Sequence, residues 1–271
     1  MKKKMTPYIL LVPQLILGVV FIIGLGTGII QSLGVIPAFG LTEPTLKYSM
    51  YIAFMSAFLA TVTGTFLCAV LVSAGKVRGI IMRIVQIPII VPHVVVALFI
   101  VNILSQNGIL ARILANAGLI TDQQQFPMLI YDRYGLGVIL AYLWKEIPFI
   151  IYFVIALMAN INGSLGEAAT NLGANKLQTF MKVTLPLCMN TVLSGFLIIF
   201  VFALGAYELP FILGATTPKA LPVLAYLEYT KPDLRARPYA MAINGILIVI
   251  ALIAAVLYYI LLRRSTKKLA G

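Results

Sequence analysis

The chain has 271 residues, of which 61% are hydrophobic and 10% are charged. Soluble domains have roughly 45–50% apolar and about 25% charged residues, so this composition excludes an ordinary water-soluble domain. The formal net charge of +12 would suit nucleic-acid binding only if the basic residues gathered on one solvated surface.

Six stretches of the chain are long and apolar enough to cross a bilayer. A transmembrane helix needs about 20 mostly apolar residues, because its backbone polar groups must be satisfied within the segment. The stretches cover residues 8–31, 51–74, 84–104, 136–158, 190–213 and 240–262. We predict an all-α integral membrane protein of about six transmembrane helices, forming a single domain over residues 1–271.

The first stretch follows Lys2, Lys3 and Lys4, an arrangement also found in secretory signal peptides. The apolar region of a signal peptide is only ~7–15 residues and ends in a small-residue cleavage site. Here the apolar run continues past twenty residues without an A-x-A sequence. We therefore expect it to be retained as the first transmembrane helix.

The basic residues are unevenly divided between alternate connections. Both ends of the chain and the second and fourth connections together have twelve basic residues and one acid, Glu167. The other connections have seven basic residues and five acids. Because Lys and Arg are retained on the cytoplasmic side, we predict that both termini are cytoplasmic. The net charge then records orientation, and we expect no nucleic-acid partner.

The third and fourth predicted spans contain polar residues that suit a solute path. Ionisable groups at membrane depth are costly and usually face a protein interior or a water path. The candidates here are Asn102, Trp144, Lys145 and Glu146. Other roles stay open, because Lys145 or Glu146 could reach the headgroups, Trp144 could be an interfacial anchor, and Asn102 could bond a neighbouring helix.

The inner connection, residues 159–189, has the most informative pattern. It reads EAATNLG from Glu167 to Gly173, and nine residues later VTLP, ending at Pro186. Ser164 lies three residues before Glu167, which fits a capping box, and Gly173 suits the left-handed backbone that ends a helix. We expect two short amphipathic helices joined at Gly173, with Pro186 breaking the second.

Such helices outside the membrane fit either a protein partner or the lipid interface. The spacing EAA-x3-G-x9-[IV]-x-LP separates the two, because it resembles the signature loop of the membrane subunits of bacterial ATP-binding-cassette importers, the binding-protein-dependent permease family. The resemblance covers about residues 51–264. It implies that residues 167–173 form a coupling helix that docks into a cytoplasmic ATPase.

The resemblance also implies roles and partners. Glu167 would anchor the docking contact, Ala168 and Ala169 would permit close approach, and Gly173 would make the turn. The implied coupling residues are Glu167, Ala168, Ala169, Leu172, Gly173, Leu185 and Pro186. The implied partners are an ATPase dimer that binds ATP and Mg, a second permease subunit of the same or a different chain, and an extracytoplasmic substrate-binding protein. The implied location is the bacterial cytoplasmic (inner) membrane.

The fifth predicted span contains Glu208 near its outer end, beside Tyr207 and just before Pro210. Proline should kink or end the helix there. A carboxylate with an aromatic neighbour could receive a cationic solute by charge attraction and cation–π contact. The alternative is an ion pair between Glu208 and an outer-loop arginine such as Arg235 or Arg237.

The sequence contains no pattern for chemistry of its own. Without a GxxxxGK[ST] sequence the chain lacks a phosphate-binding loop, so ATP energy would come from another polypeptide. Cys68 and Cys188 lie far apart in apolar segments, and we interpret His93, beside Pro92, as structural. We expect no catalytic residue, metal or cofactor in this chain.

Residues 87–93, 106–108 and 207–224 resemble the branch of the family that includes polyamine, ferric-ion, sulfate and aminophosphonate permeases. Glu208 favours a small cationic or zwitterionic solute such as a polyamine. The rival from another class is a secondary transporter driven by an ion gradient, which would need no ATPase and would tolerate changes in the loop. A membrane-embedded enzyme is disfavoured by the missing catalytic cluster.

Overall fold

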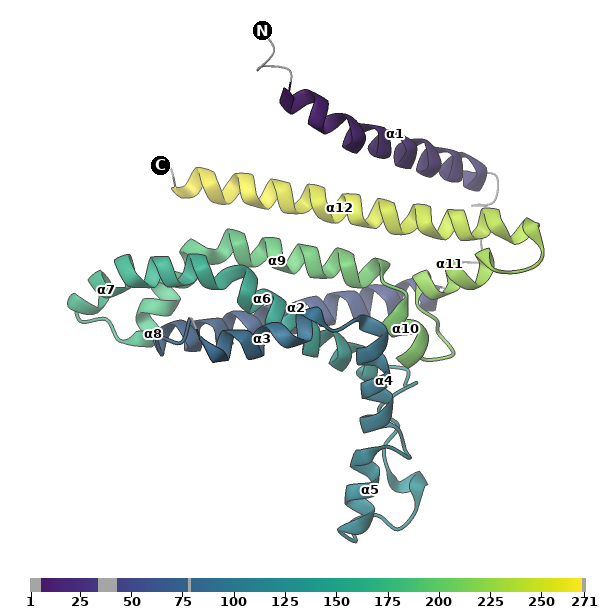
Figure 1. Ribbon diagram of the computed structural model, residues 1–271, viewed down its shortest axis with the longest axis horizontal. Helices are drawn as coiled ribbons and strands as arrows, with labels where there is room; N and C mark the ends of the chain where they lie inside the picture. Colours follow the sequence, from purple (N-terminus) through teal and green to yellow (C-terminus); the bar gives the residue numbers. More distant parts are fainter. Residues whose placement is uncertain (1–5, 34–42, 78, 270–271) are drawn as a thin grey trace.

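The computed structural model describes residues 6–33, 43–77 and 79–269 (Figure 1). Lys2, Lys3, Lys4 and Arg78, which contribute to the predicted orientation, lie outside these residues. The described part is helical and contains no strand. The six main helices are α1 (Thr6–Leu33), α2 (Glu43–Ser73), α3 (Ile80–Ile90), α6 (Leu136–Ile161), α9 (Leu185–Gly205) and α12 (Arg237–Leu269).

Helices α2, α6 and α9 form the centre of the bundle and pack on one another. Helix α3 packs on α6, α12 packs on α9, and α1 lies outermost against α12 (Figure 1). The outward side chains are apolar, and Phe21 of α1 and Leu252 of α12 are 70% and 61% exposed. A surface of this kind suits lipid, since hydrocarbon solvates apolar groups.

Six helical stretches of the described residues are long and apolar enough to cross a membrane, which confirms the predicted fold class. They are Leu11–Gly28, Glu43–Ser73, His93–Asn116, Leu136–Asn171, Lys176–Gly205 and Leu234–Arg263. The C-terminal end of α12 lies on the left of Figure 1, as the 159–189 connection does, and the N-terminal end of α1 points toward the same side.

The third predicted span, 84–104, is wrong as a single helix. Helix α3 ends at Ile90, and α4 (His93–Leu104) projects from the bundle toward the bottom of Figure 1, followed by α5 (Ile109–Asn116). Proline at position 92 disfavours helical backbone at the preceding residue. Val91 is accordingly extended, with φ −67° and ψ 128°, and the chain turns there.

The fifth predicted span, 190–213, is also divided. Helix α9 ends at Gly205, Ala206 is extended with ψ 136°, and α10 (Glu208–Leu213) follows. The break lies one turn before Pro210, because proline has no N–H to offer the carbonyl four residues earlier and its ring clashes with that carbonyl. That carbonyl belongs to Ala206, the residue that leaves the helix.

The connections at about 105–135 and 214–239 contain short helices. Besides α5 they form a 3-10 turn at Gln123–Gln125, helix α11 (Leu221–Tyr229) and a 3-10 turn at Leu234–Ala236. Helix α11 is fixed to α2 where the Leu221 N–H donates to the Ser49 hydroxyl at 2.7 Å. This end of the bundle is therefore linked to the central helix α2.

Glycine allows the three central helices to approach closely around Ile150 of α6. A Cβ on Gly64 of α2 would lie 2.8 Å from the Ile150 Cβ, and a Cβ on Gly195 of α9 would lie 2.6 Å from the Ile150 Cδ1. Small residues at such contacts let helix backbones come together in membranes. Ile150 itself is fully buried.

Gly64→Ala should lower the stability of the folded protein by about 1–3 kcal/mol, since the added methyl overpacks the contact with α6. Thermal unfolding in detergent measures the effect. The matched control is Gly245→Ala in α12, where a Cβ would meet no atom within 4 Å. Equal melting temperatures for the two variants would contradict a close α2–α6 contact.

Candidate coupling loop and translocation site

The 159–189 connection is a helical hairpin that continues the bundle helices. Helix α6 passes through a π-helical segment (Asn162–Gly166) into α7 (Glu167–Asn171). After the turn, α8 (Lys176–Thr179) passes through a second π-helical segment (Phe180–Thr184) into α9. The loop and the two bundle helices therefore form continuous helical rods.

The predicted capping box at Ser164 is wrong. The helix does not begin there, and the Ser164 hydroxyl donates back to the Asn160 carbonyl at 3.0 Å. A capping box does occur at the start of α8. Asn175 Oδ1 accepts from the Gln178 N–H at 2.9 Å, and Gln178 Oε1 accepts from the Asn175 N–H at 3.0 Å.

The predicted turn at Gly173 is confirmed. Its φ is 89°, a left-handed conformation that glycine adopts without a Cβ clash. The Gly173 N–H donates to the Thr170 carbonyl at 2.9 Å, and the Ala174 N–H donates to the Ala169 carbonyl at 3.0 Å. This pair of bonds is a Schellman motif, which satisfies carbonyls at the end of α7.

Pro186 does not break the second helix, contrary to the prediction. It lies in the first turn of α9, directly after the π-helical segment Phe180–Thr184. Proline removes one backbone donor and crowds the preceding turn. A π-helical turn can accommodate this locally while the chain remains helical. The chain therefore remains helical from α8 to the end of α9.

The coupling residues form an exposed surface with apolar and acidic parts. Glu167, Ala168 and Leu172 are exposed, and Leu172 reaches 89% exposure. Three further large apolar side chains around the hairpin are exposed, namely Leu165, Leu177 and Met181. The Glu167 carboxylate has no ion-pair partner among the residues that the structure describes. The surface is available to another molecule.

A second candidate site lies where the two helix breaks meet α6. Helices α4 and α10, which begin at the breaks, pack on each other and on α6. This packing brings His93 at the start of α4 and Glu208 at the start of α10 to the region of Tyr142 and Glu146. The site is therefore assembled from segments far apart in the sequence.

His93 belongs to this site, although the sequence indicated only a structural role. Its Nε2 lies 4.0 Å from Glu146 Oε1, and its ring centroid lies 5.1 Å from that of Phe202. Its place directly after Pro92, at a helix break, is the feature that could have identified it. Nothing in the local sequence indicates that Glu146 is its neighbour.

Lys145 and Glu146 are adjacent in sequence but have different partners. The Lys145 Nζ donates to the carbonyls of Val91 and, at 3.5 Å, Ile89. The end of a helix leaves carbonyls without intrahelical donors, and at membrane depth these need another partner. Lys145, which is 6% exposed, supplies one for the break between α3 and α4.

Two carboxylates flank Tyr142. Glu146 and Glu208 both interact electrostatically with this tyrosine, which is fully buried. Its hydroxyl has no hydrogen-bond partner within the described residues. Over the same residues Glu208 forms no ion pair with Arg235 or Arg237, so the predicted alternative is not observed. Lys145 hydrogen-bonds the carbonyls and also attracts Glu146 electrostatically, so one lysine lies near the two acids.

Three other residues predicted to line the solute path have different surroundings, namely Tyr207, Trp144 and Asn102. Tyr207 joins an aromatic group, with ring centroids 5.0 Å from Phe211 and 4.5 Å from Tyr226. Trp144 lies two residues from Tyr142, on another side of α6, and is 42% exposed. Asn102 donates its side-chain amide to the Leu98 carbonyl of its own helix at 2.8 Å. Of these three residues, Tyr207 lies nearest in the sequence to Glu208.

Residues 60–267 match the family of binding-protein-dependent transport system inner membrane components, and the chain belongs to this family. It is thus a multi-pass membrane protein of the kind that forms the inner membrane component of a binding-protein-dependent transport system. The members of this family work generally with an ATPase and a binding protein.

Several permease proteins with different named solutes are similar to this chain. A probable molybdenum permease protein from Haloferax volcanii is 28% identical over 62% of this chain and 58% of its own length. A sulfate permease protein from Synechocystis is 26% identical over 78% and 72%. A spermidine/putrescine permease protein from Haemophilus influenzae is 29% identical over 57% and 52%. The chain thus spans between about half and three quarters of the length of these relatives.

The fold is also that of a solved transporter. A chain in the crystal structure of a bacterial ABC transporter involved in the import of the acidic polysaccharide alginate superimposes with a TM-score of 0.78. The similarity covers 97% of this chain and 96% of that chain, at 20% sequence identity. It establishes the common fold.

Lys145→Met should destabilise the protein by about 1–3 kcal/mol, because the carbonyls at the end of α3 lose their donor in an apolar region. The side-chain length is retained, so packing changes little. Thermal unfolding in detergent measures the loss. Lys47→Met is the control, since Lys47 is exposed and pairs only with Glu43 on the same helix. Unchanged stability of Lys145→Met would show that the break needs no donor.

Proposed function

We propose that this chain forms half of the translocation path of an ATP-driven importer in the bacterial cytoplasmic membrane. A second permease subunit supplies the other half, an extracytoplasmic binding protein delivers the solute, and an ATPase dimer binds ATP and Mg. The exposed hairpin that is continuous with α6 and α9 is the observation that carries the proposal.

The hairpin supports a direct mechanical link. A force applied to α7 acts on α6, because only a π-helical segment separates them, and acts on α9 through α8 in the same way. Helix α6 contains Glu146, and α9 ends at the break before Glu208. Closure of an ATPase on α7 would thus move both carboxylates of the candidate site.

The proposed orientation puts α7, α8 and both termini in the cytoplasm. The N-terminal end of α1 and the C-terminal end of α12 both point toward the side of the bundle where the hairpin lies (Figure 1). The connections expected on this side have twelve basic residues and one acid, which fits the retention of Lys and Arg in the cytoplasm.

The solute we propose is small and cationic or zwitterionic, such as a polyamine. Glu146 and Glu208 supply negative charge near Tyr142, and the aromatic group at Tyr207 offers cation–π contacts. Lys145 offsets part of this charge, because it interacts electrostatically with Glu146, and Glu208 supplies the second negative charge. Ferric ion, sulfate and aminophosphonate are the alternatives, and the named relatives transport both anions and cations.

Glu208→Gln should reduce uptake of labelled putrescine or spermidine by about tenfold, the effect of removing one close charge partner. Initial uptake rates in proteoliposomes or cells measure the change. Glu228→Gln serves as the control, because Glu228 pairs with Lys231 on the outer surface. Full uptake by Glu208→Gln would remove this carboxylate from the solute site.

Glu167→Lys combined with Leu172→Asp should abolish co-purification of the permease with its ATPase. The first change reverses the charge of an exposed side chain of the hairpin, and the second replaces an exposed apolar side chain by an acidic one. Glu228→Lys makes the same charge change at the other end of the bundle and should retain the ATPase. An ion-gradient transporter would keep ATP-independent uptake in the α7 variant, and that result would replace the importer proposal.

A further inference from the structure

A small polar cavity lies between the end of α2 and the hairpin. Its volume is about 130 Å³, and its polar lining includes Ser73, Asn162, Glu167, Lys176 and Thr179. These residues come from α2, from both arms of the hairpin and from the first π-helical segment. The cavity is therefore closed by the same elements that link the hairpin to the bundle.

Several polar groups of this cavity lack partners, although the hydroxyl of Thr170, which also lines it, donates to the Gly166 carbonyl at 2.9 Å. Thr179 is 4% exposed, and its Oγ1 has no hydrogen-bond partner in the described part of the chain. Buried hydroxyls are normally bonded. Lys176 and Glu167 both line the cavity, yet neither forms an ion pair with the other or with any other described residue. The cavity thus offers one positive charge, one negative charge and a free hydroxyl.

An apolar groove lies next to the polar cavity and has two lining residues in common with it. Ser73 and Lys176 also line a cavity of about 370 Å³ whose other walls include Phe66 and Phe180. These two phenylalanines are shared with a cavity of about 500 Å³ between α2 and α9, lined also by Phe58. The three cavities together follow α2 from its hairpin end toward the middle of the bundle.

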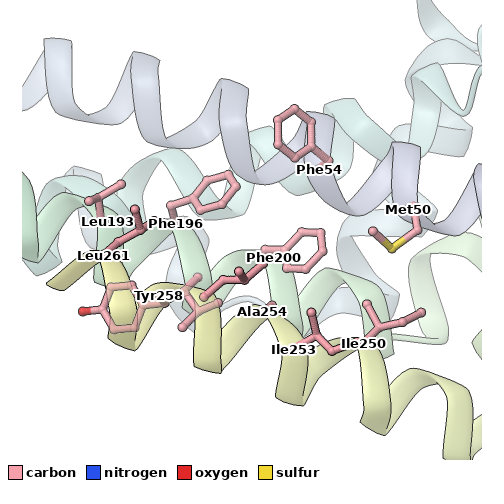
Figure 2. Close-up of a pocket in the computed structure, with 12 residues that line it drawn as sticks. Met50, Phe54, Leu193, Phe196, Phe200, Ile250, Ile253, Ala254, Tyr258 and Leu261 are labelled. Atoms are coloured by element: carbon pink, nitrogen blue, oxygen red, sulfur yellow. The ribbon is translucent and has the colours of Figure 1, made fainter. Parts of the chain in front are cut away.

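The groove continues beyond that point. The 500 Å³ cavity shares Leu193 and Phe196 with the pocket of about 300 Å³ between α2, α9 and α12 that Figure 2 shows. In Figure 2 the side chains of Phe54, Phe196 and Phe200 line it from α2 and α9. The groove is open on the outer surface, where Phe66 is 60% exposed.

The dimensions fit one acyl chain. From Ser73 to Phe58 the helix rises about 22 Å, at 1.5 Å per residue. Half of the hydrocarbon core is about 15 Å thick, so a lipid whose headgroup sits at Ser73 would lay one chain along this groove. The two cavities of the groove have the size of a ligand pocket, which is a few hundred Å³, and the polar cavity is smaller.

We propose that the polar cavity and the groove together bind one aminophospholipid with an ethanolamine headgroup. Lys176 and the Thr179 hydroxyl donate to the phosphate, and the Glu167 carboxylate accepts from the ammonium. The charge pattern favours this headgroup over an anionic one. An anionic lipid would bring a phosphate for Lys176 but no ammonium group, so Glu167 would have no cation to bind. The proposal rests on the membrane location of the chain and is independent of the solute.

Lipid binding to the purified full-length chain tests the proposal. Delipidated protein in detergent is titrated with phosphatidylethanolamine, phosphatidylcholine and phosphatidylglycerol of identical acyl chains, and bound lipid is counted by native mass spectrometry. Phosphatidylethanolamine should bind most tightly. Lys176→Gln should weaken it by about tenfold, the loss of one charge-assisted hydrogen bond. Lys182→Gln is the control, because this exposed lysine borders none of these cavities.

Two further variants separate the headgroup from the groove. Glu167→Gln should remove the preference for ethanolamine over choline, because choline cannot donate a hydrogen bond. Ala69→Trp fills the groove and should weaken all three lipids while the polar cavity stays intact. Circular dichroism and gel filtration identify variants that fail to fold.

Three results would overturn the proposal. They are unchanged affinity of folded Lys176→Gln, tighter binding of phosphatidylglycerol than of phosphatidylethanolamine by the parent chain, and displacement of the lipid by free phosphoethanolamine at equal concentration. The last would show that the groove contributes nothing. None of these results depends on an ATPase or on transport.

Discussion

The structure depends on one constraint, that backbone N–H and C=O groups in a bilayer need partners inside the protein. Continuous helices meet it by their own bonds. The break between α3 and α4 does not, and the Lys145 Nζ bonds the freed carbonyls of Ile89 and Val91. A residue that a hydropathy profile marks as costly thus stabilises the irregular backbone. The polar site around Tyr142 exists because both helix breaks lie against α6.

The candidate coupling hairpin, which we place outside the bilayer, also keeps its backbone groups bonded. Its two π-helical segments keep the chain helical where α6 and α9 leave the bundle. The non-helical backbone is confined to the turn at Gly173 and to the residues before Asn175, where a Schellman motif and a capping box supply partners. Most of the hairpin's exposed apolar surface is therefore carried on short rigid helices, which is the property a docking surface needs.

Much of this could be predicted from the sequence, since hydropathy and length identify the all-α membrane class, and the EAA spacing identifies the family. The breaks could not be fully placed. Pro92 and Pro210 mark them, but whether a proline kinks, ends or is absorbed depends on what packs beside it, and Pro186 is absorbed. The capping box at Ser164 fails because the helix already extends from α6. The pairing of His93 with Glu146 arises only from tertiary packing.

The contact of Gly64 and Gly195 with Ile150 has a consequence for movement. It is a close contact of the three central helices, and it lies four residues from Glu146 and seventeen from Glu167. At 1.5 Å per residue these are arms of about 6 Å and about 25 Å. If α6 turns about Ile150, it acts as an unequal lever. A displacement at the hairpin then arrives at Glu146 reduced roughly fourfold, with the force correspondingly increased.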